Sequence, residues 1–125
     1  MNLTQKITRS AAVVAVAAGM ATGALAAPAS AAPGISNISV GSGNTHGVWC
    51  VQNAVNNWAQ RTGKGRPLGQ DNIFGNGTKS WVQAFQRASG LPDDGIVGQN
   101  TGNSILDNSG GYRAYCYDYV PSTRH

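Results

Sequence analysis

The fold of this chain is decided by two short stretches, DNIFGNGT at residues 71–78 and DGIVGQNT at residues 94–101, which align without a gap at an offset of 23 residues. Each begins with a polar turn and continues with two apolar residues suited to a core. A Gly comes next, and a Thr follows three residues after that Gly. The Gly lets the backbone turn sharply, and the Thr hydroxyl can bond free backbone groups in the first turn of a helix. The repeat therefore predicts two similar half-units, each leading into a helix.

The segments before and after the two repeated stretches have the residue pattern of helices. In residues 46–61 apolar side chains recur at steps of three and four, which predicts a helix with one buried face and Cys50 off that stripe. A second helix is predicted for residues 76–89, ended by Gly90, and a third for residues 99–107. Two half-units are too few for a solenoid, so we expect an all-α fold in which three helices pack as one compact globule over residues 46–108.

Residues 1–31 have the pattern of a secretory signal peptide. Lys6 and Arg9 precede an uncharged run rich in Ala and Val that ends in the small-residue motif ASA at residues 29–31. A membrane anchor is the alternative, but it needs about 20 strongly apolar residues, whereas this run is dominated by Ala and meets Pro28. We therefore expect cleavage near residue 31 and a secreted protein that is extracellular or associated with the cell wall.

The charge of the chain is low and scattered. Nine Lys or Arg residues are present with five acidic residues, for a formal net charge of +4, and loss of residues 1–31 removes two of the cations. Nucleic-acid binding requires a clustered basic face, so this composition argues against that class of ligand.

The two cysteines, Cys50 and Cys116, both follow the predicted signal peptide. An even number of cysteines in an oxidising compartment predicts one disulfide, with a stabilising effect of roughly 4 kcal/mol for so long a loop. A metal pair or a catalytic thiol is the alternative, but the chain has no CxxC spacing and only His46 and His125 as partners.

Two segments flank the predicted globule. Residues 32–45 are rich in Gly, Ser and Asn, which predicts an N-terminal arm that is flexible or loosely docked on the domain. Residues 109–125 form a C-terminal tail in which Tyr recurs at every second position around Cys116. This spacing predicts an extended segment, tied to the domain by the disulfide, with three Tyr on one side and Cys116 with Val120 on the other.

The repeat and its surroundings resemble the peptidoglycan-binding domain family, whose three-helix modules occur in bacterial cell-wall enzymes and phage lysins. The resemblance covers about residues 47–107 and is carried by VxxVQxxV from residue 48, DxIFGxxTxxWVxxFQ from residue 71, GL at residue 90 and DGIVGxxT from residue 94. Three positions depart from the family pattern: Val51 replaces the usual Leu, Asn72 the usual Gly and Trp81 the usual Ala.

The resemblance implies that peptidoglycan is the ligand, through its glycan or its stem peptide, and that a cell-wall enzyme is a candidate partner. We expect no catalysis, metal or cofactor, because the chain lacks a zinc-ligand triad, a positioned carboxylate pair and a nucleophile motif. The alternative is a small secreted protein-interaction module, such as an inhibitor or effector, built on the same fold. A minimal wall hydrolase is a third interpretation.

A peptidoglycan site should combine exposed aromatic rings, which suit sugar faces, with amide or Arg donors for the peptide. Trp81 is either such a platform or a core residue. Gln86 and Arg87 lie beside the core stripe of the second helix, with solvated side chains as their alternative role, and Gln99 and Asn100 start the third helix, where free N–H groups favour anions. The candidate ligand-binding residues are Trp81, Gln86, Arg87, Gln99, Asn100, Tyr115, Tyr117 and Tyr119.

Overall fold

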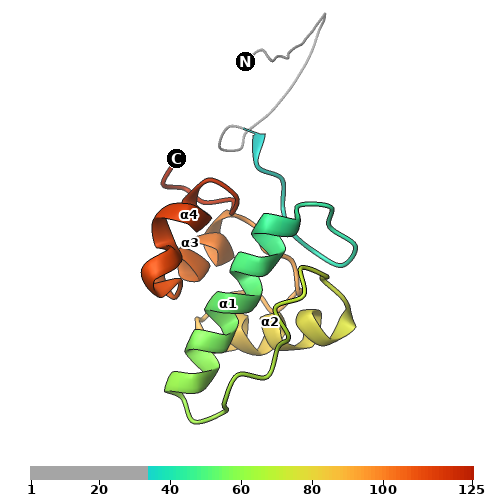
Figure 1. Ribbon diagram of the computed structural model, residues 1–125, viewed down its shortest axis with the longest axis vertical. Helices are drawn as coiled ribbons and strands as arrows, with labels where there is room; N and C mark the ends of the chain where they lie inside the picture. The colour runs from blue at the N-terminus through green and yellow to red at the C-terminus, as the bar shows by residue number, and fades with distance from the viewer. Residues whose placement is uncertain (1–33) are drawn as a thin grey trace, which may run out of the picture. The chain divides into compact units, whose positions relative to one another are not determined.

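Helix α1 (Thr45–Arg61) is the element against which the other helices pack (Figure 1). It begins at Asn44, whose side-chain Oδ1 accepts a hydrogen bond of 2.9 Å from the backbone N–H of Gly47. The structure is a computed structural model that describes residues 34–125, so the predicted signal peptide lies outside the described residues. The elements that follow α1 are α2 (Asn76–Ala88), α3 (Gln99–Asp107), the 3-10 helix η2 (Gly110–Tyr112) and α4 (Arg113–Tyr117). The predicted all-α fold is confirmed, with three helices at the predicted positions.

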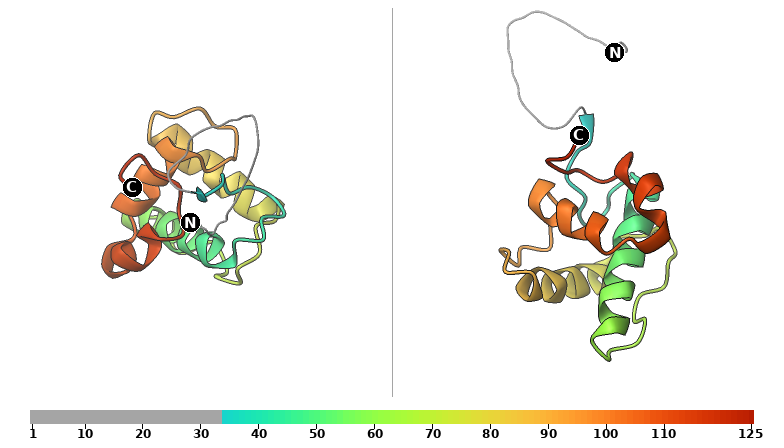
Figure 2. Two further views of the ribbon diagram at one scale, coloured as in Figure 1. Left: turned by 90° about the horizontal axis from the view of Figure 1, so that it is seen from above. Right: turned by 90° about the vertical axis from the view of Figure 1, so that its left-hand side faces the viewer.

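Helix α1 is buried on nearly every side, which corrects the expectation of a single buried face. The predicted stripe of Val48, Val51 and Val55 is fully buried, but so are Cys50 and Ala54, which lie off it. Helices α2 and α3 cover one part of α1, and η2 and α4 cover another; seen from above, α2 and α4 lie on different sides of it (Figure 2). The tail therefore completes the burial of α1.

The first half-unit is built around the buried side chain of Gln52 on α1. Its Nε2 donates to the carboxylate of Asp71 and to the carbonyl of Ile73, both at 3.0 Å, and to the hydroxyl of Thr78 at 3.2 Å. Its Oε1 accepts from the backbone N–H of Asn72 at 3.2 Å. Asn72 has a φ of 68°, in the left-handed region where Gly and Asn are best tolerated, so Asn can replace the Gly usual in the family.

The second half-unit repeats this arrangement around the buried side chain of Gln86 on α2. Its Nε2 donates to the carboxylate of Asp94, the carbonyl of Ile96 and the hydroxyl of Thr101 at 3.1, 2.9 and 3.1 Å. Its Oε1 accepts from the N–H of Gly95, which has a φ of 73°. The predicted half-units are confirmed, although in both the Thr hydroxyl accepts from a Gln rather than capping the following helix.

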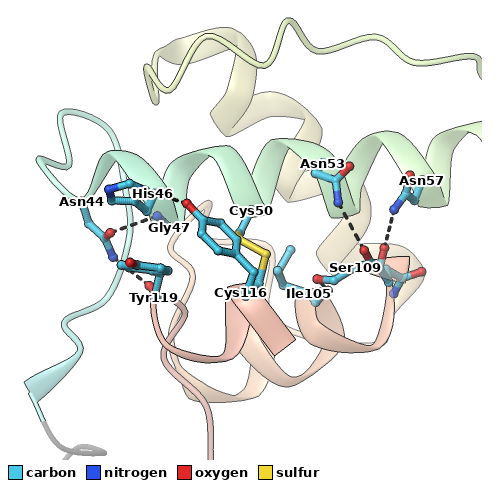
Figure 3. The surroundings of a disulfide bond; sticks show 12 residues. Asn44, His46, Gly47, Cys50, Asn53, Asn57, Ile105, Ser109, Cys116 and Tyr119 are labelled. Carbon is cyan, nitrogen blue, oxygen red and sulfur yellow. Dashed lines mark hydrogen bonds between the residues drawn. A yellow bond between two sulfur atoms is a disulfide. The ribbon is translucent and has the colours of Figure 1, made fainter. Parts of the chain in front are cut away.

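The C-terminal tail is helical, which corrects the prediction of an extended segment. The disulfide between Cys50 and Cys116 is present, with its Cα atoms 5.8 Å apart, and it joins α1 to α4 (Figure 3). The backbone N–H of Val120 donates to the carbonyl of Cys116 at 3.0 Å, and both side chains are buried. A spacing of four residues puts these two side chains on one face of a helical turn, so the same sequence fits both conformations.

From Ile38 onward the segment before α1 is docked on the domain and is not a flexible arm. Ile38 is fully buried, and its backbone forms an isolated antiparallel bridge with Val97 through hydrogen bonds of 3.0 and 2.8 Å. Further along, the N–H of Gly41 donates to the carbonyl of Phe74 at 3.1 Å. The arm thus contacts the turns of both half-units.

Candidate functional site

Five ring side chains gather where the first half of α1 meets η2 and α4. We call this group the aromatic surface; it consists of His46, Trp49, Tyr112, Tyr115 and Tyr119. The Trp49 ring meets Tyr112 edge-on at 4.9 Å between centroids and Tyr115 at 6.2 Å, while His46 stacks on Tyr119 at 4.6 Å. Tyr112 and Tyr115 are 52% and 41% exposed, so part of this cluster faces solvent.

Helical spacing and the disulfide together assemble the aromatic surface. His46 and Trp49 are three residues apart on α1, which puts them on one face, and Tyr115 and Tyr119 are four residues apart, with their rings 5.1 Å from one another. Trp49 directly precedes Cys50, and Tyr115 directly precedes Cys116. The S–S bond therefore brings the two pairs of rings together; Figure 3 shows His46 and Tyr119 beside it.

Polar groups within the cluster fix the ring positions. The Tyr115 hydroxyl and the His46 Nδ1 are 2.6 Å apart, within hydrogen-bond distance. The side-chain amide of Asn44, which caps α1, donates to the backbone carbonyl of Tyr119 at 2.8 Å. That carbonyl comes so close to Gly47 that a Cβ on Gly47 would lie 2.7 Å from it. The approach of the tail to the start of α1 therefore requires glycine at this position.

The aromatic surface borders a shallow depression of about 400 Å³, lined by four of its rings and by Asn72. None of the lining residues is a Lys, Arg, Asp or Glu. The depression thus offers apolar ring faces with hydroxyl, imidazole and amide groups at their edges. This combination suits a neutral ligand that is apolar on one face and carries hydroxyl or amide groups, such as a sugar ring.

The three predicted tyrosines of the tail do not act as one row. The structure brings Tyr115 and Tyr119 together in the aromatic surface but places Tyr117 elsewhere. The Tyr117 hydroxyl donates to the backbone carbonyl of Arg124 at 2.7 Å, and its ring lies against His125 at 4.3 Å. A helical turn separates side chains two residues apart, whereas the predicted strand would have aligned them.

Trp81 combines features of the two predicted alternatives. It is half-buried on α2, packs against the core, and its ring meets Trp58 edge-on at a centroid distance of 6.5 Å. Trp58 in turn meets the fully buried Phe85 at 5.6 Å. Trp81 is therefore part of the packing between α1 and α2 and does not belong to the aromatic surface.

The remaining candidates on α2 have structural partners. Gln86, which we predicted as a ligand-binding residue, is fully buried, and its amide bonds to the turn of the second half-unit instead of facing solvent. The sequence pattern missed this because a Gln beside a core stripe is more often solvated. Arg87 is 61% exposed and forms a salt bridge of 2.9 Å with Asp93, so its charge is already matched.

Gln99 and Asn100 lie at the start of α3, as predicted, beside a small depression of about 190 Å³. The same depression contains the carboxylate of Asp94, which accepts from the backbone N–H of Ile96 at 2.9 Å. A nearby carboxylate repels a second anion, so this helix start is poorly suited to a ligand carboxylate.

Sequence reasoning missed three members of the aromatic surface. The sequence indicates His46 only as a partner for a metal or a catalytic thiol, Trp49 lies off the predicted apolar stripe, and Tyr112 lies outside the alternating Tyr run. A usable signal was nevertheless present, because each Cys of the predicted disulfide directly follows an aromatic residue.

The comparison with protein families identifies the central part of the chain. Residues 52–105 match the family described as "Putative peptidoglycan binding domain". The match covers 54 of the 125 residues. The predicted resemblance is thereby confirmed, whereas curated proteins and solved structures gave no match. The peptidoglycan-binding domain match begins within α1 and ends within α3, so all five rings of the aromatic surface lie outside it.

Two further observations concern residues 34–125 alone. In this part of the chain no three His, Cys, Asp or Glu side chains are grouped so that they could hold a metal ion. The helices of the described residues also include none with the length and apolar character needed to cross a membrane.

Proposed function

We propose that this protein is a secreted, non-catalytic peptidoglycan binder whose aromatic surface contacts sugar rings of the glycan strand. The family match supports peptidoglycan binding in general. The observation that carries the glycan contact is the uncharged depression formed by Trp49, Tyr112, Tyr115 and His46. A sugar ring can pack its apolar face on Trp49 and Tyr112, while its hydroxyl and acetamido groups bond to the edges.

Pelleting with purified sacculi tests this proposal. The wild type should sediment with sacculi, and Trp49→Ala and Tyr112→Ala should stay in the supernatant. Tyr117→Ala is the matched control, since it removes a tyrosine of the same tail that lies off the aromatic surface. Equal sedimentation of all four proteins would exclude the aromatic surface as the contact.

The alternative functions give different results in the same experiment. A protein-interaction module would leave the wild type in the supernatant, which would refute the proposal. A hydrolase would release new reducing ends or free amino groups from the sacculi, and we expect neither. Mass spectrometry of exported protein tests secretion, because the mature chain should begin near Ala32 and be lighter by two hydrogens than its reduced form.

A further inference from the structure

A second depression adjoins the aromatic surface and differs from it in chemistry. Its volume is about 630 Å³, and Tyr112 lines both depressions. Polar and charged side chains dominate it: Asn53, Asn57, Gln60, Arg61, Arg66 and Asn108. The two depressions are thus neighbours, one uncharged and aromatic, the other rich in arginine and amide groups.

An amide network holds both arginines at this depression. Arg66 donates from one nitrogen to Asn57 Oδ1 and Gln60 Oε1, each at 2.9 Å. Arg61 donates to the side-chain oxygen of Asn108. Asn57 joins the two arginines, because its Nδ2 also donates to the backbone carbonyl of Asn108 at 2.8 Å. Both guanidinium groups are therefore oriented before any ligand arrives.

The partners of Arg61 and Arg66 are neutral. Among residues 34–125 the salt bridges are formed by three other arginines, namely Arg87, Arg113 and Arg124. A guanidinium has five N–H donors, so neither Arg61 nor Arg66 exhausts its donors on these amides. Each is an oriented cation with free hydrogen-bonding capacity and no anion.

The carboxylate at this depression does not cancel the positive charge. Asp107 lines it, but Arg113 and Arg124 donate to that carboxylate at 3.0 and 2.7 Å. Arg61 and Arg66 line the same depression, and Asp107 is the single carboxylate among its lining residues. The excess positive charge favours an anionic ligand group, and a planar guanidinium matches the two oxygens of a carboxylate.

We propose that Arg61 and Arg66 form a subsite for a carboxylate of the peptidoglycan stem peptide. The inference rests on the proposed function, because the stem peptide branches from the sugar that the aromatic surface would hold. Tyr112 lies between the two depressions, so a ligand crossing it places its sugar on the rings and its peptide beside the arginines. The protein then distinguishes glycan that carries peptide from bare glycan.

Isothermal titration calorimetry with three soluble ligands tests the subsite: a disaccharide tetrapeptide from peptidoglycan, the same compound with its carboxyl groups amidated, and the disaccharide alone. For the wild type we expect the free acid to bind about tenfold or more tightly than the amidated compound, because hydrogen bonds to charged groups are worth about 1.5 to 3 kcal/mol. The double variant Arg61→Gln/Arg66→Gln should bind both compounds alike.

A matched control separates the subsite from general charge. Lys64→Gln/Lys79→Gln also removes two positive charges, but from residues that do not line this depression, so this variant should keep the preference for the free acid. If the Arg double variant melts early, Arg66→Lys replaces it, since it keeps the charge but loses the planar fork and should lose most of the preference.

The calorimetry and sedimentation results separate failure of the subsite from failure of the proposed function. Equal binding of all three ligands to the wild type would refute the subsite and leave the proposed function intact. If the wild type binds none of the three ligands and does not sediment with sacculi, the proposed function itself is refuted. Displacement by inorganic phosphate, with equal affinity for the free acid and the amidated compound, would identify a phosphate site and refute the carboxylate proposal.

Discussion

Gly102 on α3 faces the backbone carbonyl of Pro121 so closely that a Cβ on Gly102 would overlap the carbonyl oxygen. In the first half-unit the residue at the matching position, 23 residues earlier, is Lys79, whose aliphatic chain lies over Gly95. The two half-units therefore differ at the point where the end of the chain packs on the second. Gly102 allows the tail to approach α3, as Gly47 allows it to approach α1.

Replacing Gly102 by Ala should destabilise the protein by about 1 to 3 kcal/mol, because the tail backbone must move to make room for the methyl group. Without that contact Gly→Ala within a helix would stabilise by up to about 1 kcal/mol. Gly77→Ala in α2 is the matched control, because a Cβ there meets nothing within 4 Å. Urea unfolding measures both; a Gly102→Ala protein as stable as the wild type would contradict the close packing.

Replacing Gln86 by Ala should lower the free energy of unfolding by about 3 kcal/mol, because it leaves the buried N–H of Gly95 without its partner and removes a buried amide. The adjacent Arg87→Ala should cost less than about 1 kcal/mol, since its salt bridge with Asp93 is exposed. Chemical denaturation distinguishes the two. Similar losses for both variants would mean that Gln86 is not the organising residue of its half-unit.

Removing the disulfide with Cys50→Ala/Cys116→Ala should lower the free energy of unfolding by about 4 kcal/mol, given a sequence separation of 66 residues. It should also abolish sedimentation with sacculi, because the two parts of the aromatic surface are no longer held together. Circular dichroism should show that most helix remains at low temperature. A variant that still binds sacculi fully would refute the role assigned to the disulfide.

Stability should fall slightly in acid because of Asp107. Hydrogen bonds from Arg124 and Arg113 hold the pKa of its carboxyl below the usual 3.8. The ionised form thus stabilises the fold above the unfolded-state pKa, and this contribution disappears as the pH falls through the lower, folded-state pKa. The side chain is 54% exposed, so the effect should be under about 1 kcal/mol.

The comparison with Asp107→Asn isolates this contribution. The difference in unfolding free energy between wild type and variant should be largest at about pH 6 and should vanish towards about pH 2. Arg113→Gln/Arg124→Gln should remove most of that pH dependence. A difference that grows as the pH falls would have the wrong sign for this ion pair.

The three main helices could be predicted because their signals are local. The repeated Gly and Thr positions and the steps of three and four lie within or directly before α1, α2 and α3. The buried roles of Gln52 and Gln86 could not be predicted from such local signals. Each depends on hydrogen bonds to a turn between 8 and 26 residues further along the chain.

The tail and the aromatic surface depend on contacts over longer distances. Tyr115 and Tyr119 fit one side of a strand at their spacing and also one face of a helix, and the sequence pattern alone does not choose between them. The helical form lets both Cys116 and Val120 enter the core beside α1. Only this docking explains why Trp49 meets rings from the other end of the domain.

The Cys50–Cys116 bond also has a consequence for the order of assembly. Contacts between neighbouring helices close short loops, whereas the contact between α1 and α4 closes a loop across 66 residues, at a higher cost in chain entropy. We therefore expect the contact between α1 and α2 to form early and the aromatic surface to form last. During oxidative refolding, helical circular dichroism should recover before the alkylatable thiols disappear, and retention on sacculi should follow the thiols. Thiol oxidation, and not helix formation, would then determine when the newly made protein becomes able to bind.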